Sequence, residues 1–417
     1  MKILSTLTRM WLLRSFKPFK FTNEFDQTLL YENCKGLGLY VHIPFCKKIC
    51  KFCPYCKELY FEEKIDKYID SVVKEIKLVT RNQKEKKKVT SLYFGGGSPA
   101  LAGYGIKKII DELDKHFIIK EGIGIELHPD DINIKTLQML KEIGITKISI
   151  GVQSFQKKFL NILGRSDLDY RNLFNSLNKI EFETVSMDFI FALPNQTLDD
   201  LISDVETAFE AGANHIAIYP FIDFSFAKNS IKPMSKREKK KLMDDITKYF
   251  QKNGYYRDSI WTFSKGKDTK YSSMTRDNFL GFGCSATTLL NNQFKINTFS
   301  VSEYERKISE NSLATSLTLR FTKRQRMIYY LFWTAYTTRI KEKDFEEFFD
   351  IPLKKVYRFE FWLAQKLGYF KRDDEGYEMT LKGAFYYHHY ESFYTLAYID
   401  KMWGIMRKEA FPSKLKL

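Results

Sequence analysis

The chain has 417 residues, is rich in aromatic side chains with 36 Phe and 25 Tyr, and carries a formal net charge of +16. Its length predicts two or three domains. No apolar run reaches the roughly 18 residues of a membrane-spanning helix, so we expect a soluble, cytoplasmic protein. A lysine-rich background and an anionic substrate both explain the charge, which by itself does not separate them. Because the lysines are scattered, we expect no nucleic-acid partner.

Residues 1–35 form an N-terminal segment with basic residues spread through it and no small-residue cleavage site, which makes it a poor signal peptide. Residues 10–13, next to Arg14 and Lys17, are also compatible with a segment that contacts a membrane surface. We favour an N-terminal arm that packs on its own domain, without stable membrane insertion.

Three cysteines follow a short β-like run, residues 39–45. Cys46, Cys50 and Cys53 are spaced C-x3-C-x2-C. A [4Fe–4S] cluster normally takes four thiolates. A loop that supplies three leaves one iron open to bind and activate a small molecule, so the spacing predicts a cluster of this kind.

Other cysteine chemistries fit this loop less well. A zinc site usually shows two C-x2-C pairs or a distant His pair. The parsing Cys50, Cys53, Cys56 starts like a ferredoxin motif, but Tyr60 stands where a cysteine would be needed. Clustered thiols in a chain without a secretory signal argue against disulfides. Cys56 is left with three interpretations: a spectator, a ligand in the resting state, or a participant in the chemistry.

The cysteine spacing resembles the motif of the radical S-adenosylmethionine (SAM) superfamily. The resemblance implies that SAM chelates the open iron through its amino and carboxylate groups. Electron transfer from the cluster would then release a 5′-deoxyadenosyl radical.

Beyond this loop, apolar runs alternate with segments of helical periodicity. The expected strands are the run before the cysteines and residues 89–94, 124–127, 147–152, 185–190 and 215–219; the expected helices are residues 61–79, 106–117, 134–143, 168–180 and 198–211. Six strands alternating with helices predict a parallel α/β sheet with right-handed crossovers. In barrels of this kind the working residues sit at the carboxyl ends of the strands.

Polar residues and glycines fall at or near these strand ends. They are Gly95, Gly96, Gly97, Glu126, Gln153 and Asp188. The glycines allow close backbone approach to a ligand, the polar side chains suit ribose hydroxyls, and Arg165 suits a carboxylate. An isolated strand-end carboxylate is more often a helix cap or an ion-pair partner. Four such features around one cysteine loop favour a SAM site.

Five motifs together resemble one branch of the superfamily, the group similar to oxygen-independent coproporphyrinogen III dehydrogenase. They are Y-V-H-I-P-F-C at 40–46, F-G-G-G-S-P at 94–99, S-I-G-V-Q-S-F at 149–155, residues 188–194, and N-F-L-G-F-G at 278–283. The resemblance covers residues 36–300 and implies a partial (β/α)6 TIM-like barrel. It implies that Tyr40, Glu126, Gln153, Arg165 and Asp188 line the SAM sites. Tyr40 and Cys56 are our candidate catalytic residues.

The chain departs from members of this branch at two places. Cys56 lies three residues after Cys53, one further than in the decarboxylase of haem synthesis. Residues 272–277 lack the His and Trp that the haem chaperone carries before its Leu-Gly-x-Gly segment. We expect Cys284 to be a small buried residue, with contact to the substrate as the alternative.

Residues 299–417 predict a mainly helical, winged-helix-like domain that acts as a lid, after an arm at 1–35 and a barrel at 36–298. Helices are expected at 324–336 and 354–367, and a wing at 377–383. His388 and His389 are expected as a solvated pair on a helix face, with haem ligation as the alternative.

The branch members include haem-degrading enzymes and class C radical methyltransferases. The resemblance therefore implies radical chemistry on a conjugated, anionic ring, with a tetrapyrrole as first choice. We expect a [4Fe–4S] cluster, one or two SAM molecules, and an electron donor such as flavodoxin or ferredoxin. The alternatives are a coproporphyrinogen III decarboxylase and a non-enzymatic haem chaperone.

Overall fold

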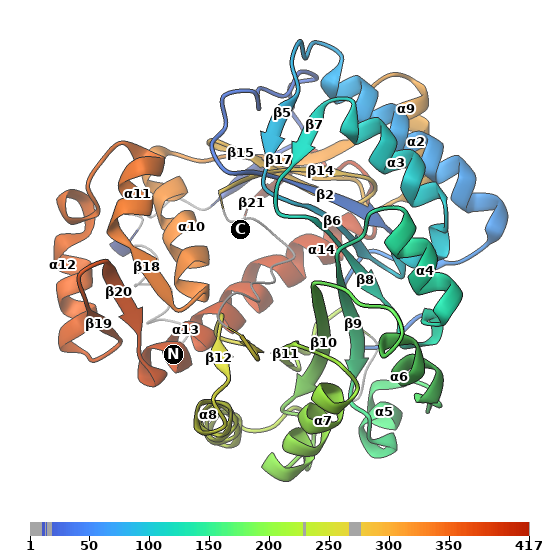
Figure 1. Ribbon diagram of the computed structural model, residues 1–417. Coiled ribbons are helices and arrows are strands. Elements are labelled where there is room, and N and C mark those ends of the chain that lie inside the picture. The colour runs from blue at the N-terminus through green and yellow to red at the C-terminus, as the bar shows by residue number, and fades with distance from the viewer. Residues whose placement is uncertain (1–10, 13, 15–18, 228–230, 267–276, 417) are drawn as a thin grey trace.

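A computed structural model describes residues 11–12, 14, 19–227, 231–266 and 277–416. Six parallel strands form the middle of its main sheet in the order β11, β10, β9, β8, β6, β2 (Figure 1). Their bounds are β2 Leu37–Ile43, β6 Leu92–Gly96, β8 Ile123–Leu127, β9 Lys147–Gln153, β10 Thr184–Phe191 and β11 His215–Pro220. The expectation of six parallel strands in an α/β fold is confirmed.

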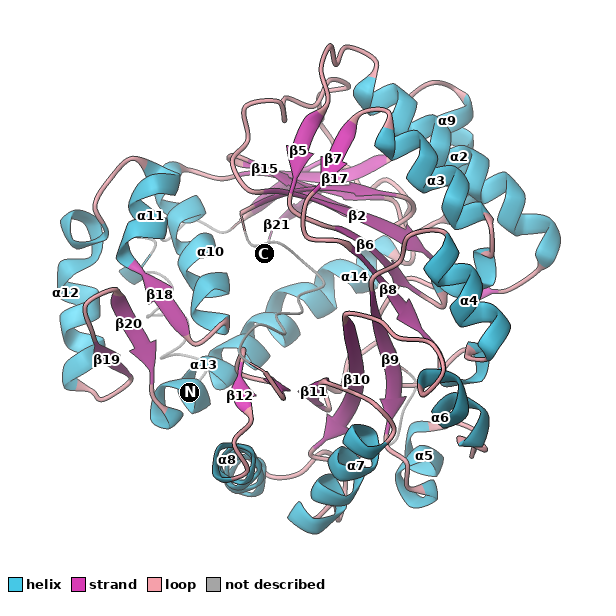
Figure 2. Cartoon of the chain, viewed as in Figure 1, coloured by secondary structure: helices cyan, strands magenta, loops and turns pink. Residues whose placement is uncertain are grey.

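Helices cover the outer side of this curved sheet (Figure 2). They are α2 Glu62–Thr80, α3 Gly105–Asp114, α4 Ile134–Glu142, α5 Lys157–Leu163, α6 Arg171–Leu177, α7 Leu198–Glu210 and α8 Lys236–Lys252. Two expectations differ from the structure: α5 is an additional helix, and the helix expected at 168–180 is shorter. Asp169 accepts a hydrogen bond from the Arg171 N–H at 3.0 Å, and this local turn delays the helix start.

The sheet continues beyond β2 through strands that the alternating pattern did not reveal. β14 Asn278–Phe282 is parallel to β2, and antiparallel strands follow it in the order β15 Thr287–Leu290, β16 Gln293–Asn297, β17 Thr315–Arg320, β1 Lys20–Thr22 and β21 Lys414–Lys416. β13 Thr262–Ser264 and β12 Tyr256–Arg257 extend the other edge. Short pairs are β3 Phe45–Cys46 with β4 Glu58–Leu59, and β5 Lys87–Val89 with β7 Phe117–Ile119.

The C-terminal part contains the expected winged unit. β18 Arg339–Lys341, β20 Gly376–Met379 and β19 Phe370–Arg372 form a three-stranded sheet beside α10 Lys323–Tyr336, α11 Glu342–Phe349 and α12 Leu353–Lys366. α13 Leu381–Tyr394 and α14 Asp400–Met406 then run back toward the main sheet (Figure 1). α9 Val301–Ser309 and β17 belong to the main-sheet side. β16 and β17 pair with each other although they lie on opposite sides of the expected division at 298/299. That division stays a prediction.

The N-terminal arm contacts two parts of the molecule: β1 joins the main sheet, and Trp11 and Leu12 contact the winged unit. The Trp11 ring meets the Phe359 ring edge-on at 6.1 Å, and Arg324 Nε donates to the Leu12 carbonyl at 2.7 Å. No helix in the described ranges is long and apolar enough to cross a bilayer. Most of residues 1–18, and residues 272–276 whose composition separates the chain from the haem chaperones, lie outside the described residues.

Candidate active site at the carboxyl ends of the parallel strands

The cysteine loop leaves the end of β2 and is tied to neighbouring elements by lysines. Lys47 Nζ lies 2.6 Å from Asp131 Oδ1, and Lys48 Nζ donates to Ser166 Oγ at 3.1 Å. Lys57 Nζ donates to the Cys50 and Cys53 carbonyls at 3.2 and 2.5 Å. These contacts hold the loop against the ends of β8 and β9 and leave the thiols themselves uninvolved.

The three loop thiols are free, half-buried and close enough to influence one another. Burial, followed by the adjacent Cys53 and Cys50 thiols, raises the pKa of Cys46 to about 12. Iron binding to Cys46 must therefore displace a proton. Within the described ranges no three Cys, His, Asp or Glu side chains converge as a single ion would require. A [4Fe–4S] cluster takes one thiolate at each of three irons, so thiols spread around a loop fit it.

The glycines at the end of β6 are required by the close approach of neighbouring groups, which for Gly97 belong to the cysteine loop. A Cβ at Gly97 would overlap the Phe45 carbonyl and lie 2.9 Å from Cys46 Sγ, and a Cβ at Gly95 would lie 2.9 Å from the Tyr40 hydroxyl. Gly96 N–H donates to Glu126 Oε2 at 3.0 Å, and Gly97 N–H donates to the Ile43 carbonyl at 2.8 Å. Protein groups thus occupy two of the N–H donors that we expected to face a ligand.

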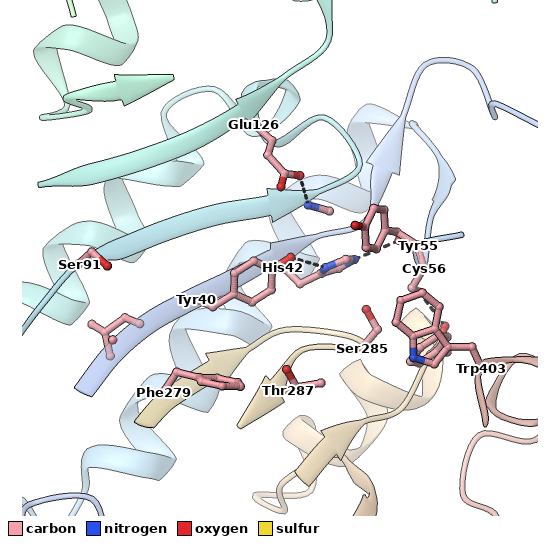
Figure 3. A pocket seen from close by; sticks show the side chains of 14 residues that line it. Tyr40, His42, Tyr55, Cys56, Ser91, Glu126, Phe279, Ser285, Thr287 and Trp403 are labelled. Atoms are coloured by element: carbon pink, nitrogen blue, oxygen red, sulfur yellow. Dashed lines mark hydrogen bonds between the residues drawn. The ribbon is translucent and has the colours of Figure 1, made fainter. Parts of the chain in front are cut away.

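Tyr40 and His42 form a hydrogen-bonded chain along β2 (Figure 3). His42 Nε2 lies 3.0 Å from the Cys56 carbonyl, which can only accept, so Nε2 carries the proton. Nδ1 therefore accepts from the Tyr40 hydroxyl at 3.0 Å. Burial lowers the pKa of His42 to about 4, which keeps the ring neutral. The Tyr40 oxygen keeps its lone pairs for a ligand.

Glu126 on β8 and Asp188 on β10 are carboxylates whose ionisation is opposed by burial. Burial raises the pKa of Glu126 to about 7, with a further increase from the Asp188 charge, and raises the pKa of Asp188 to about 6. Ser149 Oγ donates to both Asp188 oxygens at 3.1 and 3.0 Å. Both carboxylates are suited to accept hydrogen bonds from the hydroxyls of a ligand, because such bonds stabilise the charged form of a carboxylate.

Gln153 and Arg165 lie together beside the end of β9. Gln153 has a φ of +70°, an uncommon value for this residue type, and its Nε2 would lie 2.9 Å from a Cβ placed on Gly151. Arg165 donates to the Gly151 carbonyl, and its guanidinium lies 5.8 Å from the Phe52 ring centroid of the cysteine loop. Arg165 Nε is buried with no hydrogen-bond partner within the described ranges. An unpaired donor beside the cysteine loop fits the carboxylate of a ligand.

A cavity of about 180 Å³ runs along β2, from Gly38 near the start of the strand to His42 near its end (Figure 3). It is lined by Gly38, Leu39, Tyr40, His42, Tyr55, Cys56, Ser91, Gly96, Glu126, Phe279, Ser285, Thr287, Phe299 and Trp403. Of the sequence-predicted site residues it brings together Tyr40, Cys56, Gly96 and Glu126. The other predicted site residues lie outside this lining: Gly95, Gly97, Gln153, Arg165, Asp188 and the loop cysteines Cys46, Cys50 and Cys53.

Several lining residues escaped the sequence reasoning. His42 was discoverable, because it follows Tyr40 by two positions on one strand and shares its face. Trp403 carried no such signal: α14 brings it over the cavity, 6.0 Å from the Tyr55 ring and 5.9 Å from Phe299. Arg407 Nη2, in the same segment, donates to the Tyr55 carbonyl at 3.0 Å.

Cys56 does not join the three loop thiols. Its sulfur lies 3.7 Å from Cys284 Sγ and 3.2 Å from the Phe299 carbonyl, and Cys284 is fully buried as expected.

The expectation of a solvated His388–His389 pair is wrong for His388, which is 5% exposed. Its ring packs edge-on against Trp261 at 4.6 Å, so it is enclosed in α13 packing.

Comparison with known proteins identifies the domain. Residues 40–208 match the Radical SAM superfamily. The chain is 26% identical over 289 residues to the heme chaperone HemW of Bacillus subtilis, covering 65% of this chain and 76% of HemW. It is 27% identical over 194 residues to the oxygen-independent coproporphyrinogen III oxidase of Pseudomonas aeruginosa, covering 44% and 42%.

A solved structure shares the fold across nearly the whole chain. Coproporphyrinogen III oxidase (HemN) from Escherichia coli, described as a radical SAM enzyme, superimposes with a TM-score of 0.75 at 22% identity, covering 92% of this chain and 98% of HemN. The domain implies a [4Fe–4S] cluster and SAM. Residues 40–208 thus match the Radical SAM superfamily, the chain shares its fold with HemN, and the proteins similar to it include ones named HemW and oxygen-independent coproporphyrinogen III oxidase.

Proposed function

We propose that the chain is an enzyme that uses SAM and a [4Fe–4S] cluster held by Cys46, Cys50 and Cys53 to start radical chemistry on a conjugated, anionic ring, with a tetrapyrrole as first choice. The observation that carries the proposal is the cavity itself. Its wall combines strand-end polar groups, Tyr40 and Glu126, with Cys56, three residues beyond the cluster ligands. The cluster and SAM supply a 5′-deoxyadenosyl radical when bound.

The chain's own residues would bind and orient the cofactor. Arg165 Nε offers an unpaired donor for the SAM carboxylate, and Gln153 lies beside it. Glu126 and Asp188 would accept hydrogen bonds from the ribose hydroxyls; Glu126 and Tyr40 line the cavity, and Asp188 lies outside its lining. The glycines at 95–97 give SAM space next to the loop, with two of their N–H groups already bonded to protein.

Aromatic side chains support a flat ring substrate. Tyr55, Phe279, Phe299 and Trp403 line the cavity, and Trp403 arrives from the C-terminal α14, as a lid would. Among the described residues, no lysine or arginine belongs to the lining, so substrate carboxylates would extend to its edge, where Arg407 lies. Radical methyl transfer, with a second SAM, is our first proposal for the reaction; decarboxylation is the alternative. A flavodoxin or ferredoxin would supply the electrons.

Haem carriage without turnover is the second candidate, because the chain matches 76% of the length of a protein named as a heme chaperone. An anaerobic incubation with reductant, SAM and either haem or coproporphyrinogen, followed by mass spectrometry, separates these functions. A modified haem with S-adenosylhomocysteine and 5′-deoxyadenosine supports methyl transfer. Loss of carbon dioxide from coproporphyrinogen with 5′-deoxyadenosine alone supports decarboxylation. Stable haem binding with neither product supports carriage and contradicts the enzyme.

A further inference from the structure

Cys56 and Cys284 bring two thiols together from distant parts of the chain. Their sulfur atoms are 3.7 Å apart, although 228 residues separate them in sequence. Cys56 is 5% exposed and Cys284 0% exposed. Neither is needed to complete the loop of Cys46, Cys50 and Cys53, so this pair is a second, separate sulfur site.

Backbone constraints fix the position of Cys284. Gly283 before it has a φ of +98°, and a Cβ there would lie 2.5 Å from the His42 carbonyl. Ser285 after it has a φ of +59°, a strained value for a residue other than glycine. The Cys284 N–H donates to the Tyr68 hydroxyl at 2.8 Å. The turn between β14 and β15 is thus held in a shape that aims the sulfur at Cys56.

The two thiols differ in access to the cavity. Cys56 lines it together with Tyr40 and Glu126, whereas Cys284 is not part of the lining and is fully buried. Cys56 S–H has the Phe299 carbonyl as acceptor at 3.2 Å, and Cys284 S–H has the Thr298 carbonyl at 3.1 Å. The cavity therefore meets one thiol of the pair, and the second thiol stands in contact with it.

We propose that Cys56 is a hydrogen-atom donor to carbon radicals in the cavity and that Cys284 is its partner in a disulfide formed afterwards. This inference rests on the proposed radical function. An S–H bond is weaker than an alkyl C–H bond, so transfer from Cys56 to a carbon radical is downhill. Disulfide formation then closes the pair from 3.7 Å to a sulfur–sulfur distance of about 2.05 Å.

The steps balance in atoms and electrons. First, the Cys56 S–H bond breaks homolytically, a C–H bond forms on the radical, and a sulfur radical is left on Cys56. Next, this sulfur bonds to Cys284, whose proton leaves to solvent while one electron passes to an oxidised iron–sulfur cluster. A dithiol reductant then returns the disulfide to two thiols.

The test omits substrate, so that the 5′-deoxyadenosyl radical itself must take a hydrogen atom. Reconstituted protein, equilibrated in D2O, receives SAM and a limiting one-electron reductant without added thiol. Mass spectrometry measures deuterium per 5′-deoxyadenosine formed and the Cys56–Cys284 disulfide in the digested protein. Cys56→Ser removes the donor, because a hydroxyl O–H bond is too strong to donate. Cys34→Ser controls for loss of a buried cysteine outside the cavity lining.

We expect deuterated 5′-deoxyadenosine and the disulfide in the wild type and in Cys34→Ser, and loss of most of the deuterium in Cys56→Ser. Counting deuterium per product molecule makes the comparison independent of cluster loading. Unlabelled product from the wild type, or retained label in Cys56→Ser, overturns the inference and leaves the proposed function intact. A wild-type protein that loads its cluster but forms no 5′-deoxyadenosine overturns the proposed function and this inference with it.

Discussion

The molecule contains two cysteine groups that were assembled in opposite ways. Cys46, Cys50 and Cys53 lie within eight consecutive residues, so their spacing alone predicts a shared ligand. Cys56 and Cys284 are 228 residues apart and meet only because β14 lies beside β2. The first group is half-buried and held through its backbone carbonyls; the second is buried with its sulfurs in contact. Local spacing thus identifies ligands, whereas a contact pair requires the fold.

The largest expected effect separates the two groups directly. Cys50→Ala should lose most of the iron bound after anaerobic reconstitution, since one of three thiolates is removed. Cys56→Ala should keep it, because the Cys56 sulfur contacts Cys284 and the Phe299 carbonyl. Iron per chain and the cluster's visible absorbance measure both. Equal iron loss in the two variants would indicate that Cys56 is a cluster ligand like Cys46, Cys50 and Cys53.

A glycine substitution tests whether the loop of Cys46, Cys50 and Cys53 depends on the backbone at the end of β6. Gly97→Ala places a Cβ against the Phe45 carbonyl and 2.9 Å from Cys46 Sγ. Such overpacking costs about 1–3 kcal/mol and should displace the loop, lowering both cluster content and the unfolding midpoint. Gly404→Ala is the matched control: its nearest neighbour is 3.9 Å away, and alanine in a helix gains roughly 0.5–1 kcal/mol. Full iron loading in Gly97→Ala would show that the loop adapts.

Asp188 extends the comparison to the proposed SAM site. Asp188→Ala should weaken SAM binding by about 1.5–3 kcal/mol, the usual contribution of a charged hydrogen bond, while the protein stays folded. Asp204→Ala is the structural counterpart, because that buried carboxylate accepts from Ser154 Oγ at 2.7 Å and from Phe155 N–H at 3.0 Å. The main effect of Asp204→Ala should be on the unfolding temperature, with a smaller effect on SAM affinity. Calorimetric titration and thermal unfolding compare the variants, and the reverse pattern would make Asp188 structural.

The smallest effect concerns pH. The pKa of Glu126 is raised from 4.5 to about 7 by burial, so the folded protein holds a proton that the unfolded chain releases. The carboxyl's contribution to stability is full below pH 4.5 and is lost as the pH rises through 7. Glu126→Gln keeps the shape without titrating. The wild-type minus variant difference in unfolding free energy should fall over this range by on the order of 1–3 kcal/mol. A difference in unfolding free energy, measured by urea titration, that does not change with pH would contradict the raised pKa of Glu126.

Much of the architecture was predictable from local pattern. The six parallel strands follow from hydrophobic periodicity, and this expectation is confirmed. The wing at 377–383 was expected from the resemblance, and it is cut short because α13 begins at Leu381. The strands from β14 to β17 were not identified, because they are short and do not alternate regularly with helices: β14, β15 and β16 follow one another directly, and α9 separates β16 from β17. The roles of Glu126, Gln153, Arg165 and Asp188 remain predictions that their positions support.

The sequence by itself determined the cysteine loop, the alternation of strands and helices, and the polar residues at the strand ends, because each depends on neighbours within a few residues. Only the tertiary structure decided which side chains share the cavity. Trp403 reaches Tyr55 through the path of α13 and α14, and Cys284 reaches Cys56 through the pairing of β14 with β2. Such contacts join residues hundreds of positions apart. Their formation depends on the packing of whole elements, which local spacing does not encode.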